Sequence, residues 1–131
     1  MLKISRILLY LMFPIFVFLW NEIFILTGLY DVFTWLGMPM HFIGGISIAY
    51  FSFYTINYLQ EEKYLRLNKF LLFVFVISLV SLFAVLWESY EFLVDIIFGF
   101  NYQPSLEDTM ADLFIGLAGG MTAILILLKK Q

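Results

Sequence analysis

Cysteine is absent from this chain of 131 residues, and charged residues make up only 13% of it. The absence of cysteine excludes disulfide bonds, thiolate catalysis and zinc sites built from cysteine. A soluble domain carries about 25% charged residues, whereas 63% of this chain is hydrophobic and its mean hydropathy is +0.98. A soluble core of this size could not bury so much apolar surface. We therefore exclude a soluble enzyme and a disordered tail, and expect lipid to be the solvent.

Basic residues are also few. Seven Lys and Arg against ten Asp and Glu give a formal net charge of -3. Such a chain has no basic patch for the phosphate backbone of a nucleic acid. We therefore expect no nucleic-acid partner, and the lipid bilayer as the main partner.

Four apolar stretches are long enough to cross a bilayer, which takes about 20 residues in a helix. They cover about residues 7–29, 39–59, 70–98 and 106–128. A backbone in lipid must satisfy its own hydrogen bonds, and the alternating pattern of barrel strands is absent, so helices are expected. Because the links are short, residues 1–131 are predicted to form a single transmembrane domain, an all-α antiparallel bundle of four transmembrane helices.

The distribution of basic residues predicts the orientation of this bundle. All seven lie at the N-terminus, in the middle loop or at the C-terminus: Lys3, Arg6, Lys63, Arg66, Lys69, Lys129 and Lys130. Four antiparallel spans place these three regions on one side, and Lys and Arg collect on the cytoplasmic side. Both the N- and C-termini are therefore expected to be cytoplasmic. The tryptophans, Trp20, Trp35 and Trp87, lie toward the opposite interface.

Most of the acidic residues belong to that opposite, extracytoplasmic half. Eight of the ten lie there together with the single histidine, His41, and no Lys or Arg: Glu22, Asp31, Glu88, Glu91, Asp95, Glu107, Asp108 and Asp112. Such carboxylates must be hydrated, protonated or bridged by a cation. Helical spacing places Glu88, Glu91 and Asp95 on one face of the third helix, and Asp108 and Asp112 on one face of the fourth.

Several of these residues also have a purely structural explanation. Residues 105–108 match a capping box, so Asp108 could serve only to cap the fourth helix. Others could be loop acids, a first-turn acid or polar groups bonded to a neighbour: Asp31, Asp95, Glu107, His41 and Glu22 (beside Asn21). Acids within a span usually face the bundle interior and mark a functional path. This argument is strongest for Glu88, Glu91 and Asp112.

Two glycine-rich segments predict close helix packing. Gly44 and Gly45 lie on the second helix, and the fourth contains Gly116 and Gly120 in a G-x-x-x-G pattern, which lets helices approach closely in lipid. Packing of these two helices would bring His41 near Asp112, and we expect this contact. Packing alone is the simpler explanation for the glycines.

Three segments together resemble a known family. They are Asp31 followed by HFIGG at residues 41–45, LWESYEF at residues 86–92 with Asp95, and LEDTMADL at residues 106–113 followed by Gly116. This pattern resembles the YjdF-like integral membrane protein family of prokaryotes, which is distantly VanZ-like. The resemblance implies a multi-pass protein of the prokaryotic cell membrane and supplies no reaction. VanZ-like proteins are linked to glycopeptide resistance and the cell envelope.

Relatives in that family tend to have additional N-terminal helices. A homo-oligomer, in which a second copy replaces those helices, is therefore one hypothesis for the assembly.

Three functions are compatible with these residues. The first is a metal-dependent enzyme acting on a lipid-linked or envelope substrate at the outer leaflet. In it, His41, Glu88 and Glu91 are the catalytic candidates, with His41 as a ligand or general base. The divalent cation would be Mg²⁺, Mn²⁺ or Zn²⁺. The candidate metal ligands are Glu88, Glu91, Asp108 and Asp112. Without a nearby Lys or Arg, the cation itself would have to hold a phosphate.

The other two functions need no catalysis. One is a cation or proton transporter, because carboxylate and histidine chains carry protons across membranes. The cytoplasmic half, however, offers few polar residues for such a path. The other is a non-enzymatic envelope binding or assembly protein, in which the acids hold a structural Ca²⁺ or a cationic partner.

Overall fold

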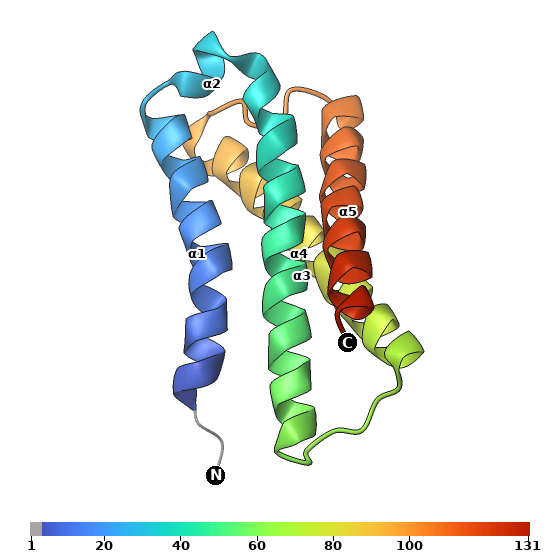
Figure 1. Ribbon diagram of the computed structural model, residues 1–131. Helices are drawn as coiled ribbons and strands as arrows, with labels where there is room; N and C mark the ends of the chain where they lie inside the picture. Colours follow the sequence, from blue (N-terminus) through green and yellow to red (C-terminus); the bar gives the residue numbers. More distant parts are fainter. Residues whose placement is uncertain (1–3) are drawn as a thin grey trace.

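A computed structural model describes residues 4–131 of the chain, which form four long helices (Figure 1). These are α1 (Ile4–Leu26), α3 (Gly37–Glu61), α4 (Lys69–Phe98) and α5 (Leu106–Lys129). Two short elements, α2 (Leu29–Val32) and η1 (Thr34–Leu36), connect α1 to α3. The part of the chain that the structure describes contains no strand, and each long helix, with η1 continuing into α3, is long and apolar enough to cross a membrane. The predicted all-α membrane bundle is confirmed.

The first connection is more ordered than hydropathy suggests. The first long helix ends at Leu26, whereas the apolar stretch continues to Leu29. Gly28 prevents the helix from continuing through this stretch, because it adopts φ +68°, a left-handed conformation that glycine reaches without strain. The short helix α2 then begins at once. The connection thus places Tyr30 and Asp31 on a helical turn above the bundle.

The helices α4 and α5 each begin after a residue whose side chain caps the N-terminus of the helix. The side chain of Asn68 accepts from the Leu71 backbone N–H at 2.9 Å and begins α4. Ser105 does the same for Asp108 at 3.1 Å and begins α5. The serine half of the expected capping box is therefore present. Each such cap contributes about 1 kcal/mol to helix stability.

The central helix α3 contacts α1, α4 and α5, and its contact with α5 is the most extensive. A Cβ added to Gly45 would lie 1.8 Å from the carbonyl oxygen of Gly116, and one added to Gly119 would lie 2.0 Å from that of Phe42. The two backbones touch at these points, as small residues allow in lipid. Below them lies an apolar core: Ala49, Phe53, Ile56, Leu72, Val76, Val80, Ala123 and Ile124.

The two described ends of the chain lie at the same end of the bundle (Figure 1). The Arg6 guanidinium lies 3.5 Å from the Glu61 carboxylate. The Gln131 amide donates to Asn57 Oδ1 at 3.0 Å. Both contacts bring chain ends to the last turns of α3. Lys3 lies outside the described residues, and the cytoplasmic orientation of this end stays a prediction.

Candidate metal centre

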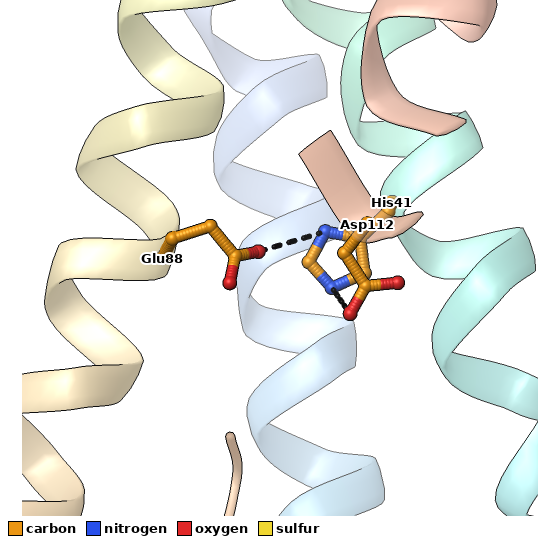
Figure 2. A group of neighbouring side chains, drawn as sticks. All are labelled: His41, Glu88 and Asp112. Carbon is orange, nitrogen blue, oxygen red and sulfur yellow. Dashed lines mark ion pairs between the residues drawn. The ribbon is translucent and has the colours of Figure 1, made fainter. Parts of the chain in front are cut away.

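Three helices each contribute one side chain to a cluster near the opposite end: His41 from α3, Glu88 from α4 and Asp112 from α5 (Figure 2). His41 Nδ1 lies 3.7 Å from Glu88 Oε1, and His41 Nε2 lies 3.4 Å from Asp112 Oδ2. One ligand atom from each residue lies within 4.8 Å of the other two. The imidazole thus lies between two carboxylates from different helices.

The glycine contact explains why these residues meet. Gly45 follows His41 by one helical turn, and Gly116 follows Asp112 by one turn. A Cβ on Gly116 would also lie 3.5 Å from the His41 carbonyl oxygen. Because α3 and α5 touch through their backbones here, the side chains one turn above are held together. This is the His41–Asp112 contact expected from the glycine pattern.

Only one of the two carboxylate oxygens of Glu88 has a hydrogen-bond partner. The residue is 6% exposed, and its Oε2 accepts from Gln103 Nε2 at 2.8 Å. Its Oε1 is buried without a hydrogen-bond partner. The nearest ion-pair partner of that oxygen is His41 Nδ1, at a distance beyond hydrogen-bond range. Within residues 4–131, no Lys or Arg forms an ion pair with this cluster. A buried carboxylate oxygen in this state needs a cation, a proton or a water molecule as its partner.

Two of the other predicted site residues lie outside this group of three. Glu91 is buried and accepts from Trp87 Nε1 at 2.8 Å. The Trp87 ring also lies edge-on to His41, with ring centroids 5.9 Å apart. Asp108 lies in the first turn of α5, where its backbone N–H donates to Ser105. These contacts give Glu91 and Asp108 partly structural roles. Neither supplies one of the three clustered ligand atoms, which belong to His41, Glu88 and Asp112.

A second polar cluster joins α1 to α4 and to the short helix. The Tyr30 hydroxyl donates to Asn21 Oδ1, and the Tyr90 hydroxyl donates to Glu22 Oε2. Glu22 is therefore hydrogen-bonded to Tyr90, and the amide oxygen of Asn21 is taken by Tyr30. Asn21 Nδ2 and Glu22 Oε1 are buried without partners.

The Tyr30 phenol is kept in its neutral form mainly by burial. Burial, and then the charges of Glu91, Glu22 and Asp112, raise the pKa of Tyr30 above its ordinary value of 10.0. The phenol therefore remains a hydrogen-bond donor throughout the physiological pH range.

Asp95 has a structural role that its spacing did not reveal. Its carboxylate accepts from the backbone N–H groups of Tyr102 at 2.8 Å and Gln103 at 2.9 Å. These bonds hold the link between α4 and α5, so that the Gln103 amide can reach Glu88. Sequence reasoning missed Gln103, because a glutamine in a short loop carries no periodic signal. Asp31 lies exposed in the outer connection.

The fold and this cluster define an integral membrane protein with four apolar helices and a His/Glu/Asp group near one end. Comparison with known sequences gives its family. Residues 2–130 match the family described as "Predicted membrane protein (DUF2238)", and the chain belongs to that family. This agrees with the YjdF-like resemblance; the comparisons do not extend it to VanZ-like proteins.

A bacterial relative supports the same placement. The chain is 36% identical over 93 residues to an uncharacterized protein of Thermotoga maritima. The match covers 70% of this chain and 47% of the relative, so the chain spans about half the relative's length. No solved structure matches the chain. The family and the four helices are consistent with a multi-pass protein of the cell membrane.

Proposed function

We propose that this protein binds a divalent cation at His41, Glu88 and Asp112, and uses it at the extracytoplasmic side on the anionic group of a lipid-linked substrate. The observation that carries the proposal is the unpartnered Oε1 of Glu88, which is buried and aimed at the imidazole (Figure 2). Buried polar atoms in proteins are almost always completed by a partner, and a cation is the partner proposed for this one.

The distances favour a cation over a direct hydrogen-bond chain. A nitrogen–oxygen hydrogen bond spans about 2.7–3.2 Å, whereas the two imidazole–carboxylate contacts are 3.4 and 3.7 Å. Two ligand atoms bound tetrahedrally to one ion at about 2.1 Å lie roughly 3.4 Å apart. An imidazole gives one nitrogen to one ion, so only one of these two contacts is a ligand pair of a single ion, and the separation of His41 Nε2 from Asp112 Oδ2 has that spacing. One ligand atom from each of the three residues, Glu88 included, lies within 4.8 Å of the other two.

The donor set suggests which cation binds. One imidazole and two carboxylates combine the preferences of Zn²⁺ with those of Mn²⁺. Three protein ligands leave a coordination position open for water or substrate, as in catalytic zinc sites. A bound cation there would polarise a phosphoryl oxygen or lower the pKa of a bound water. Gln103 would orient the Glu88 carboxylate from behind, as outer partners of metal ligands do.

The first test is metal binding by the full chain in detergent after chelation. Titration with Zn²⁺, Mn²⁺, Mg²⁺ and Ca²⁺ would be followed by thermal unfolding and by metal content per chain. A cation at 100 times its Kd should raise the free energy of unfolding by about 2.7 kcal/mol. We expect this increment for the wild type and its loss in Glu88→Gln and Asp112→Asn.

The matched control is Asp31→Asn, which removes an exposed acid at the same end of the bundle. It should keep the increment of the wild type. The proposal is wrong if no cation stabilises the wild type, or if Glu88→Gln responds as the wild type does. Binding without any change to added lipid phosphates would favour the structural, non-enzymatic alternative.

A cation or proton transporter is the second candidate, and one observation favours it. The buried hydroxyls of Ser47, Ser52 and Thr55 follow His41 along α3, and those of Ser52 and Thr55 lack partners. They provide polar steps toward the other end of the bundle. Cation- or proton-dependent flux into proteoliposomes, lost in Ser52→Ala, would support this function over the first.

A further inference from the structure

An open groove lies between the C-terminal half of α4 and the first turns of α5. Its volume is about 430 Å³, and Glu88, Ser89, Gln103 and Thr109 contribute to its lining. Figure 1 shows why it forms: α4 crosses behind α3, with its C-terminal end on the α1 side and its N-terminal end on the α5 side. The helices α4 and α5 therefore diverge toward the end that carries the acidic residues.

The groove has two kinds of wall. Val85, Phe92 and Leu93 line it with exposed apolar side chains. They lie on a helix that is long and apolar enough to cross a membrane, and exposed apolar side chains of this kind suit contact with an acyl chain. Gln103 and Thr109 provide polar groups at the same groove. A molecule that fits both walls has an apolar chain and a polar head.

Glu88 connects this groove to the candidate metal centre. The residue lines the groove, its Oε2 is held by Gln103, and its Oε1 faces His41. A head group in the groove would therefore lie beside a cation bound to that oxygen. A second cavity, which touches His41 and Trp87, has a volume of only about 60 Å³ and is too small for a lipid chain.

Building on the proposed function, we infer that the substrate is an anionic phospholipid that reaches the centre sideways from the bilayer through this groove. The acyl chain lies against Phe92 and Leu93, and the phosphate lies toward Glu88. The groove contains no Lys or Arg in its lining. The phosphate is therefore held by the cation and by hydrogen-bond donors such as Gln103 and Thr109.

The test fills the groove and leaves the metal ligands in place. Ser89 and Ser78 are both exposed on α4, and both donate to the carbonyl four residues earlier, at 2.7 and 2.8 Å. Only Ser89 lines the groove. Ser89→Trp is thus the blocking variant and Ser78→Trp its matched control. Val85→Trp, at another exposed residue that lines the groove, blocks it should Ser89→Trp fail to fold.

The probes are dioctanoyl phosphatidic acid and glycerol 3-phosphate, added to the full chain in detergent with the stabilising cation. Thermal unfolding gives the apparent affinity of each. We expect phosphatidic acid to bind the wild type and Ser78→Trp alike, and to bind Ser89→Trp at least ~10-fold more weakly. The stabilisation by cation alone should be unchanged in all three, and glycerol 3-phosphate should bind more weakly than the lipid.

Failure of this inference can be distinguished from failure of the proposed function. Cation stabilisation without any effect of phosphatidic acid, or with equal lipid affinity in Ser89→Trp, overturns the groove and leaves the metal centre standing. Equal binding of glycerol 3-phosphate overturns the lipid as occupant. A wild type that no cation stabilises overturns the metal centre, and a lipid effect abolished by Ser89→Trp would then still support the groove.

Discussion

The packed half of the bundle and its acidic end use the same helices in opposite ways. In the packed half, α3 and α5 touch through glycine backbones, and Ala49, Val76 and Ile124 are completely buried. At the acidic end, a carboxylate oxygen of Glu88 is buried without a hydrogen-bond partner. The packed half also has unpaired atoms, but these are neutral hydroxyls, which cost less to bury than a carboxylate does. The first region is stabilised by its own contacts, whereas the second keeps a buried carboxyl oxygen that its own side chains do not satisfy.

The largest expected effect comes from a variant that breaks the contact between α3 and α5, which supports both regions. Gly45→Ala places a Cβ against the Gly116 carbonyl, so α3 and α5 must separate. We expect a loss of about 3 kcal/mol or more in the free energy of unfolding, measured by denaturation in mixed micelles. The same variant should lose the cation response, because His41 and Asp112 move apart.

Gly44→Ala is the control for that variant. It lies on the same helix one residue away, and an added Cβ has no atom within 4 Å. It should be neutral or gain up to about 1 kcal/mol, the advantage of alanine over glycine in a helix. Equal losses in both variants would show that α3 and α5 do not meet at Gly45.

A smaller effect is expected in the apolar core. Leu72 on α4 is 2% exposed, whereas Leu82 on the same helix is 52% exposed. Leu72→Ala should reduce the free energy of unfolding by about 2 kcal/mol, near the low end for buried leucines, because lipid replaces water as the reference solvent.

Leu82→Ala should cost less than about 0.5 kcal/mol, since acyl chains fill the space that its side chain leaves. Both variants should bind the cation as the wild type does. If Leu72→Ala weakened cation binding, the two regions would not be independent.

The smallest expected change in the free energy of unfolding is neutral or stabilising, unlike the losses above. In chelated protein, Glu88→Gln removes a buried charge that has no cation beside it, so we expect stability within about 0.5 kcal/mol of the wild type or above it. With the cation present, the wild type should be the more stable. A substantial loss in chelated protein would show that the carboxylate is satisfied by the chain itself.

Hydropathy alone determined the membrane-spanning character of this protein. Four apolar stretches of sufficient length allow no other arrangement of a lipid-exposed backbone than helices, and the short links make them antiparallel. The glycines on two of these helices also pointed to the meeting of His41 with Asp112. Those inferences succeed because they depend on local composition and on the helical repeat.

Only the tertiary structure decided which acids meet. Glu88 and Glu91 are three residues apart, so their directions differ by about 60° around the helix axis. Glu88 faces His41, and Glu91 is bonded to Trp87. Spacing places both on one broad face, and the crossing of α4 behind α3 selects between them (Figure 1). Likewise Gln103 reaches Glu88 only because Asp95 folds the loop back. Contacts of this kind depend on where helices cross, and no local pattern in the sequence encodes that position.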